Sequence, residues 1–169
     1  MADFSQLITQ HIPRLRRYAK ALFSDPALAE DLVQDCLERA WSKQHLWNGS
    51  GDIRAWLFSI MHNLHANEAR KFNRRPALIP MEAQNDQPIT GNQESTLALN
   101  ELEAALHNLP EKQREVLLLV GLEQMSYEEA ADVLNVPTGT VMSRLSRARE
   151  NLRSTLYGAH KQSNIRRIK

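Results

Sequence analysis

The C-terminal end of the chain carries side chains that can bind a polyanion. Residues 138–169 contain eight basic residues and one acid, although the net charge of the whole chain is only +1. The basic residues are Arg144, Arg147, Arg149, Arg153, Lys161, Arg166, Arg167 and Lys169. Guanidinium groups donate paired hydrogen bonds to phosphate oxygens and to guanine, so basic residues clustered along a helix are typical of nucleic-acid binding. The pattern therefore predicts a polyanion-binding segment.

An acidic stretch in the N-terminal half suggests a different partner. Residues 30–38 contain Glu30, Asp31, Asp35 and Glu38 and no basic residue. Such a surface suits a basic protein partner rather than DNA. An acidic helix face is often merely solvated, so these residues alone leave both interpretations open.

Three other groups of residues could do chemistry, and each is a weaker candidate. His62, His65 and Glu68 have the i, i+3, i+6 spacing of a metal site or an acid–base pair, but there is no HExxH motif and Glu68 drifts off the shared helix face. The sequence NGSG lacks the Lys-Ser or Lys-Thr of a phosphate-binding loop. Cys36, the single cysteine, lies on an apolar helix stripe and is expected in the core rather than as a redox sensor. We therefore expect no metal, no cofactor and no enzymatic activity.

Helical periodicity places these residues on a series of helices. A helix is expected from about Phe4 to Phe23, bent or split at Pro13. A second follows Pro26, and its apolar face is Leu28, Leu32, Val33, Cys36, Leu37, Ala40 and Trp41. Asp52 is a candidate N-cap for a third, whose apolar face is Ile53, Trp56, Leu57, Ile60, Met61 and Leu64. Between these two helices, residues 44–51 form a turn rich in Asn, Gly and Ser.

The chain then divides at a polar segment. Residues 76–100 contain three prolines and no Lys or Arg, and helical periodicity resumes only near Thr96. Further helices are expected to end at Pro110 and Gly121. No strand pattern of useful length is present, so the sequence predicts an all-α protein of two small helical domains joined by a flexible linker. The expected divisions are residues 1–75, a linker at 76–95, residues 96–158, and a basic tail at 159–169.

The segment SYEEAADVLNVPTGTVMSRLSRARENL has the pattern of a helix-turn-helix. Ser126 and Glu129 have capping-box spacing at the start of a short helix, which is broken at residues 135–138. A longer helix follows to about Leu156, with a buried stripe of Val141, Leu145, Ala148, Leu152 and Leu156. Its outer residues are Thr140, Ser143, Arg144, Arg147 and Asn151. In this motif the second helix enters the major groove of DNA. An ordinary helical hairpin with a solvated basic face is the alternative.

These motifs resemble the extracytoplasmic-function group of bacterial sigma factors over nearly the whole chain. LPEKQREVLLLVGLEQMSYEEAADVLNVPTGTVMSRLSRARENL is similar to the family's region 4, which reads the minus-thirty-five promoter element. AEDLVQDCLERAW and IRAWLFSIMHNLHANEARKFNRR are similar to region 2, which binds core polymerase and opens the minus-ten element. The chain is too short for the additional conserved regions of housekeeping sigma factors.

The resemblance implies roles for individual residues. Asp31, Gln34, Asp35 and Glu38 match the helix that docks on a coiled coil of the largest polymerase subunit. The minus-ten set is Trp47, Asn48, Asn63, Arg70, Lys71, Arg74 and Arg75, in which the loop 46–52 and Asn63 match positions that hold a flipped base. The minus-thirty-five set is Thr140, Met142, Ser143, Arg144, Ser146 and Arg147. Met61 and His62 stand where many relatives have Ala-Arg.

The function implied is that of an alternative sigma factor acting in a stress or signal response. Its expected partners are the largest and second-largest subunits of core RNA polymerase, promoter DNA and an anti-sigma factor. No stretch is apolar enough to cross a membrane, so we expect a cytoplasmic protein without membrane insertion. An autonomous helix-turn-helix regulator, with the N-terminal half serving dimerisation or ligand binding, is the main alternative. An enzyme built on His62 and His65 is the other.

Overall fold

The computed structural model describes residues 3–74 and 93–166, and all regular structure in those two ranges is helical. Side chains at positions 73, 74, 93 and 159–166 lie outside the description. The all-α prediction is confirmed. Among the described residues, no helix has the length and apolar character needed to span a membrane.

The first helical unit forms as its local signals predict. Its elements are α1 (Phe4–Thr9), α2 (Ile12–Leu22), α3 (Pro26–Ser42), the short 3-10 helix η1 (Gln44–Leu46) and α4 (Ile53–Arg74). The expected helix over residues 4–23 is indeed split, with Pro13 in the first turn of α2, where its missing N–H costs nothing. Asp52 begins α4, because its Oδ1 accepts a hydrogen bond from the backbone N–H of Arg54 at 2.8 Å.

The second unit contains longer helices than the sequence indicated. Its elements are α5 (Gln93–His107), α6 (Glu111–Leu117), the π-helical turn η2 (Leu118–Leu122), α7 (Tyr127–Leu134) and α8 (Thr138–Arg166). Helix α5 begins three residues before Thr96, inside the expected linker. Helix α8 continues ten residues past Leu156, since neither Gly158 nor any proline stops it.

The apolar stripe of α3 is narrower than predicted. Its buried side chains are Ala29, Leu32, Val33, Cys36 and Ala40. Leu28 and Trp41 were expected on this stripe but are 50% and 53% exposed. At about 100° per residue, these two side chains lie at opposite margins of the buried arc. This correction leaves two large apolar groups on the surface of α3.

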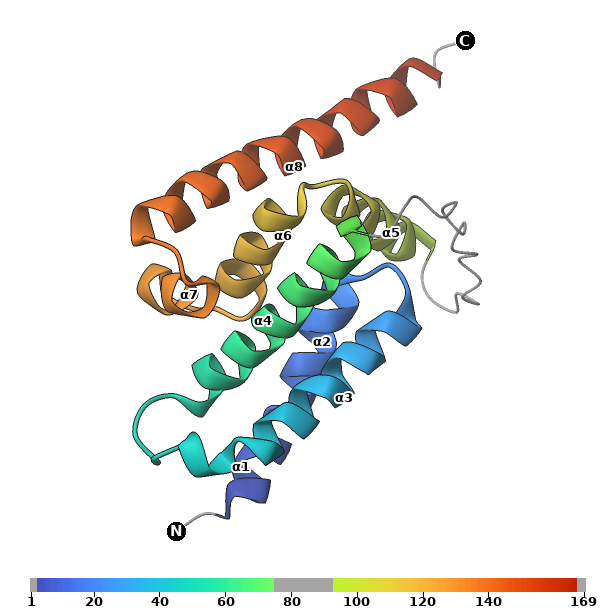
Figure 1. Cartoon of the computed structure of the whole chain (residues 1–169). Coiled ribbons are helices and arrows are strands. Elements are labelled where there is room, and N and C mark those ends of the chain that lie inside the picture. The colour runs from blue at the N-terminus through green and yellow to red at the C-terminus, as the bar shows by residue number, and fades with distance from the viewer. Residues whose placement is uncertain (1–2, 75–92, 167–169) are drawn as a thin grey trace.

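The two units share one hydrophobic core. Figure 1 shows α4 lying between the other helices of the first unit and the pair α6 and α7, with α8 crossing over the second unit. Tyr18 on α2 and Phe58 on α4 pack edge to face, with ring centroids 5.2 Å apart. Buried residues of α2, α3 and α4 belong to the same cluster as Val116, Leu119 and other residues of α6 to α8. The described units are therefore docked on one another.

Candidate functional site

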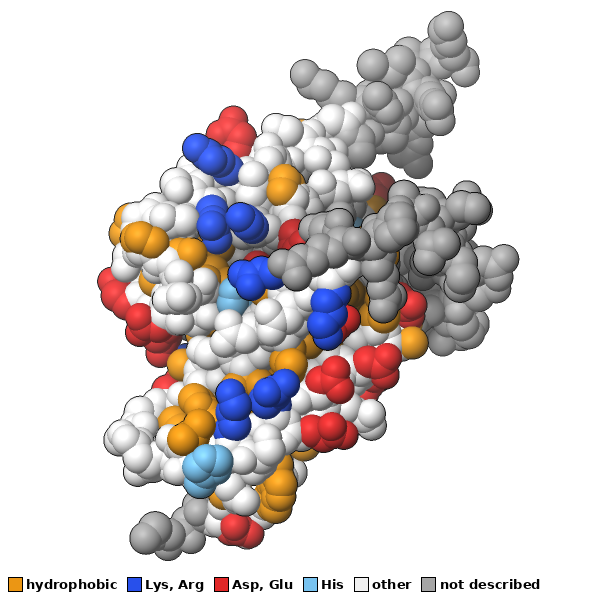
Figure 2. Space-filling view, in the orientation of Figure 1, with side chains coloured by type: hydrophobic (Ala, Val, Ile, Leu, Met, Phe, Trp, Pro, Cys, Tyr) orange, Lys and Arg blue, Asp and Glu red, His pale blue; other side chains and the backbone are white. Residues whose placement is uncertain are grey.

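The acidic surface of α3 is exposed, as predicted. Asp31, Gln34, Asp35 and Glu38 are all exposed, and they project opposite the buried stripe of the helix. Figure 2 shows acidic side chains gathered over α3. The exposed Leu28 and Trp41 flank this acidic face. Apolar groups beside a charged surface are a common feature of protein–protein interfaces.

Cys36 lies on the buried side of the same helix. The side chain is completely buried, and its Sγ donates to the carbonyl oxygen of Leu57 at 3.5 Å. Burial raises the pKa of the Cys36 thiol to about 12, so the reactive thiolate is disfavoured. Its predicted place in the core is confirmed.

Reciprocal hydrogen bonds fix the start of the helix-turn-helix. The Oγ of Ser126 accepts from the backbone N–H of Glu129 at 3.1 Å, and Glu129 Oε2 accepts from the N–H of Ser126 at 2.8 Å. Asn135 then ends α7 in the left-handed region, with φ of 52°, a conformation that asparagine tolerates better than most residues. The predicted capping box is confirmed, and the turn directs α8 across α7.

Helix α8 presents part of its expected recognition surface. Val141, Leu145 and Ala148 are buried, whereas Leu152 and Leu156 are only half-buried. The buried stripe is therefore shorter than predicted, because the helix extends beyond the body that it packs on. On the outer side, the exposed members of the minus-thirty-five set are Met142, Ser143, Ser146 and Arg147. Thr140 and Arg144 are half-buried at the margin of that surface.

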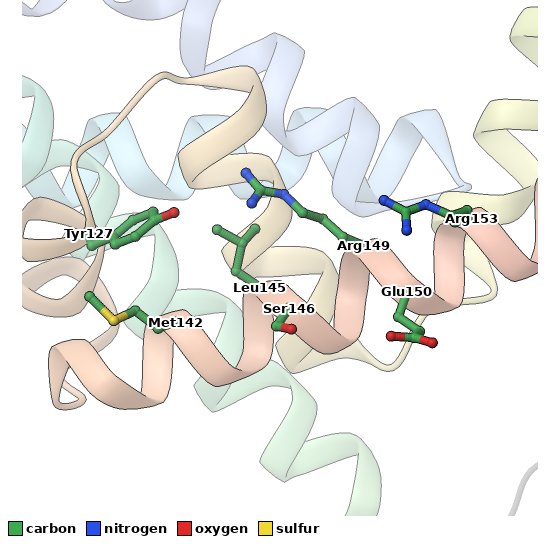
Figure 3. Close-up of a pocket in the computed structure, with 7 residues that line it drawn as sticks. All are labelled: Tyr127, Met142, Leu145, Ser146, Arg149, Glu150 and Arg153. Carbon is green, nitrogen blue, oxygen red and sulfur yellow. The ribbon is translucent and has the colours of Figure 1, made fainter.

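A shallow hollow borders this surface. It has a volume of about 350 Å³ and is lined by Tyr127 of α7 and by residues of α8 (Figure 3). Met142 and Ser146 line it, so two members of the minus-thirty-five set open onto the hollow. In Figure 3, Arg149 and Arg153 extend from one side of α8 and Glu150 from the other. The basic character of α8 therefore continues past the first turns of the helix.

Two parts of the predicted minus-ten set lie on one side of α4: the loop that carries Trp47 and Asn48, and the helical residue Asn63. The ring of Trp47 packs against Trp56, with centroids 5.6 Å apart. Asn63 is exposed and follows Trp56 by seven residues, which puts it on the same helix face about 10 Å further along. Asn48 is also exposed, and its Oδ1 accepts from the N–H of Ser50 at 3.0 Å. The Trp47 ring, through Trp56, and Asn63 thus share a face of α4, about 10 Å apart along the helix.

The basic part of the minus-ten set lies near the end of α4. Arg70 and Lys71 are exposed, and Lys71 pairs with Glu68 at 3.1 Å. The backbone of Arg74 is helical while its side chain is not described, and Arg75 lies outside the described residues. Glu68 therefore pairs with a lysine rather than forming a group with His62 and His65.

Sequence reasoning missed a row of polar contacts between the two units. Arg17 of α2 pairs with the buried Glu123 at 2.9 Å. Arg54 of α4 donates to the carbonyl of Glu123 at 3.1 Å and pairs with Glu129 at 3.4 Å. Cationic groups of the first unit thus meet carboxylates of the second.

Two histidines of α4 extend the same row. His62 Nδ1 lies 2.9 Å from Glu115 Oε1, and His65 Nε2 lies 2.6 Å from Glu111 Oε1. Met61, beside His62, is fully buried. His62 of this dipeptide therefore belongs to the contact between units. One signal was available in the sequence, because histidines three residues apart and glutamates four residues apart each lie on one helix face.

Comparisons with known proteins agree with this architecture. Residues 8–62 match the family model described as the Sigma2 domain of PhyR, and residues 99–152 match the model of sigma-70 region 4. The ECF RNA polymerase sigma factor EcfG of Rhodopseudomonas palustris is 36% identical over 146 residues, covering 86% of this chain and 81% of that relative.

Solved structures share the fold over almost the whole chain. The sigma factor RpoE of Bartonella quintana, in complex with the anti-sigma factor NepR, has a TM-score of 0.74 and 33% identity, covering 93% of this chain and 98% of that one. CnrH in complex with the cytosolic domain of CnrY has a TM-score of 0.67 and 28% identity, covering 92% and 88%. With both conserved regions present in order and relatives of this extent, the chain belongs to the extracytoplasmic-function family of RNA polymerase sigma factors, which direct transcription initiation.

Proposed function

We propose that three surfaces of this chain divide the work of a sigma factor. The acidic face of α3 binds a basic surface of core polymerase. The Trp47 loop and Asn63 hold an unpaired base of the minus-ten element, while Arg70 and Lys71 attract the DNA strand. The exposed side of α8 reads the minus-thirty-five element, with Arg147 as the main base-reading residue.

The observation that carries this proposal is the separation of charge between two exposed helix faces. The acids of α3 face away from its core, and Ser143 and Arg147 of α8 face away from theirs. The acidic face of α3 is unexpected in a protein that binds only DNA, because its negative charge repels phosphate. The exposed side of α8 that carries Ser143 and Arg147 is likewise unexpected in a protein that binds only polymerase. Together they suit a protein that joins the two.

The docked arrangement is too compact to contact both promoter elements at once. Helix α7 packs against both α4 and α8, so where they contact α7 the axes of α4 and α8 lie at most two helix-packing distances apart, about 20 Å. The positions named minus ten and minus thirty-five are separated by about 85 Å of duplex at about 3.4 Å per base pair. We therefore propose that the units separate when the holoenzyme binds a promoter.

In vitro transcription with purified core polymerase is the deciding experiment. A sigma factor should give promoter-specific transcripts only when both this chain and core polymerase are present. Binding of the isolated chain to duplex promoter DNA should be weak. Strong binding without polymerase, together with no transcript, would instead support the autonomous helix-turn-helix regulator.

An anti-sigma factor is a further proposed partner. The solved relatives described as RpoE and CnrH are each seen in a complex, the first with an anti-sigma factor and the second with CnrY. This chain exposes large apolar side chains on α3, α4, α5 and α8, among them Leu28, Phe72, Leu97 and Met142. Such groups suit a partner that covers them.

A second candidate function comes from the N-terminal family model. That model is named for PhyR, and a solved chain titled as the anti-anti-sigma factor PhyR shares the fold at 17% identity. A sigma-like protein of this kind would bind an anti-sigma factor without starting transcription. The same transcription assay separates the two candidates, because only a sigma factor yields a transcript.

A further inference from the structure

Four ionisable side chains meet where α4 of the first unit contacts α6 of the second. Potential ligand atoms of His65, Glu111 and Glu115 all lie within 4.8 Å of one another. His62 joins the group through its 2.9 Å contact with Glu115. These residues are distant in the sequence, and the docking of the two units brings them together.

The histidine at the centre of this group is buried without a directed hydrogen bond. His65 is 7% exposed, and neither of its ring nitrogens has a hydrogen-bond partner among the described residues. Its Nε2 is close to Glu111 Oε1, at 2.6 Å, but lies off the direction that a hydrogen bond requires. The His65 and Phe23 rings pack edge to face, with centroids 5.2 Å apart. Buried polar atoms of this kind call for an additional partner.

The donor set has the chemistry of a divalent transition-metal site. One imidazole and two carboxylates are ligands that Zn²⁺ accepts, with water in a remaining position. Bonds of about 2.0–2.2 Å bring ligand atoms within about 4 Å of each other, and rotation of the Glu111 side chain, which is 46% exposed, allows this. The contact from His62 would orient Glu115 from outside the metal's immediate shell.

No arginine or lysine of the described residues forms an ion pair with either carboxylate. In the described ranges, the ion-pair partners of Glu111 and Glu115 are histidines alone. Arg114 lies between them in sequence, but its guanidinium donates to the carbonyl oxygens of Leu22, Leu106, His107 and Leu109. A bound dication would supply the compensating charge.

We propose that His65, Glu111 and Glu115 bind one Zn²⁺ ion, or a similar divalent transition-metal ion, and that the ion holds the two units together. Because α4 and α6 both supply ligands, the ion binds the docked arrangement and not the separated one. A free metal concentration 100 times the dissociation constant favours the docked arrangement by about 100-fold. Metal binding does not depend on the proposed promoter function, whereas any effect on transcription would.

Metal titration of the full chain, without a polyhistidine tag and after treatment with a chelator, tests the site. Calorimetry with Zn²⁺ should show one ion per chain, and Co²⁺ should give the visible absorption of a nitrogen- and oxygen-ligated ion. His65→Gln and Glu111→Gln should each weaken binding at least tenfold. Glu103→Gln is the matched control and should bind normally, because Glu103 pairs with His107 within α5 alone. Circular dichroism should show that each variant is folded.

Separation of the units is measured independently of polymerase. Spin labels on Ser42→Cys and Glu150→Cys report the distance between α3 and α8, and Cys36 is buried away from the label. Zn²⁺ should narrow the distance distribution in the labelled chain and leave it unchanged when Glu111→Gln is added. Absence of saturable binding, or binding by His65→Gln and Glu111→Gln as tight as that of the unsubstituted chain, would overturn the site. Binding with no change in the distances would overturn its role in holding the units together.

Discussion

Arg17 and Glu123 form an ion pair across the boundary between the two units, 106 residues apart in the sequence. Arg17 Nη2 lies 2.9 Å from Glu123 Oε1, and the Glu123 side chain is fully buried whereas that of Arg17 is 52% exposed. The second carboxylate oxygen of Glu123 has no hydrogen-bond partner among the described residues. The Glu123 carboxylate thus has Arg17 as its ion-pair partner, while Arg54 binds the backbone carbonyl of the same residue.

Replacing Arg17 with alanine should destabilise the docked structure. Removing the ionic partner of a buried carboxylate lowers the free energy of unfolding by about 1–3 kcal/mol. We expect a loss near the lower end of this range, because the Arg17 side chain is half exposed and solvent screens the pair. Urea unfolding followed by circular dichroism measures the free energy of unfolding. Arg16→Ala is the matched control, because Arg16 pairs at 3.4 Å with Glu30 and both side chains are about half exposed. A loss no greater than that of the control would show that Glu123 does not rely on Arg17.

Local signals in the sequence were sufficient to predict most helix boundaries. Ser126 and Glu129 form the expected capping box, and Pro13 divides the first helix. These features depend on interactions between residues only a few positions apart, so they can be predicted from a short stretch of sequence. The end of α8 was harder to predict, because a helix continues until something stops it and no strong stop signal occurs before Arg166.

The contact between the units could not be read from local patterns. His62 and Glu115 are 53 residues apart, and nothing in either segment alone identifies the other as its partner. Sequence reasoning grouped His62 and His65 with Glu68 because helical spacing relates those three. In the structure Glu68 is exposed and pairs with Lys71, while carboxylates of α6 approach the histidines. Tertiary packing decides such pairings.

The free energy of unfolding should fall in mildly acidic solution through His11 and His107. Desolvation by burial lowers the pKa of both side chains from 6.5. Each histidine therefore binds a proton more readily in the unfolded chain than in the folded one. Their contribution is fully present above pH 6.5 and is lost as the pH falls through their lower folded pKa values.

Urea unfolding at several pH values between about pH 7.5 and pH 5 measures this effect. His11→Gln combined with His107→Gln should flatten the dependence of the free energy on pH. His45→Gln, at an exposed histidine of η1, is the control substitution. An unchanged slope in the double variant would assign the acid sensitivity to other groups.

Reversing the charge of the α3 face should weaken binding to core polymerase. Asp31→Lys with Asp35→Lys places two positive charges where a basic partner surface is proposed, and we expect a loss greater than tenfold, or about 1.4 kcal/mol. Fluorescence anisotropy of the labelled chain with core polymerase measures the affinity. Glu128→Lys with Asp132→Lys makes the same charge change with the same spacing on α7, where both acids are exposed. Equal losses in the two double variants would show that net charge, not the α3 face, controls the affinity.

Asn63→Ala and Trp47→Ala should impair promoter melting more than binding to core polymerase. Stacking and edge contacts with an unpaired base are worth about 1–3 kcal/mol. Permanganate footprinting of the minus-ten region should show reduced reactivity, and a promoter with a pre-melted bubble should partly restore transcription. Asn100→Ala on α5 removes an exposed asparagine elsewhere and should melt the promoter normally. Normal footprints for both test variants would exclude this face of α4 as the pocket.

Arg147 should determine base preference within the minus-thirty-five element. Its side chain is exposed on the third turn of α8, next to the exposed Ser143, and the buried Val141 and Leu145 fix the opposite side of the helix against the body. A bidentate arginine contact with guanine contributes about 1–3 kcal/mol of discrimination, whereas a phosphate contact strengthens binding to all sequences alike.

Transcription by holoenzyme across a library of minus-thirty-five sequences separates these two roles. Arg147→Ala should flatten the preference at one position of the element by about tenfold or more. Arg144→Ala should lower transcription from all promoters similarly, because Arg144 is half-buried at the margin of the surface and better placed for phosphate. Ser143→Ala tests the neighbouring contact, and Arg153→Ala, about 9 Å further along the helix, is the control for loss of positive charge alone. If Arg147→Ala changes only the overall level of transcription, to the same extent as Arg153→Ala, then Arg147 does not read a base.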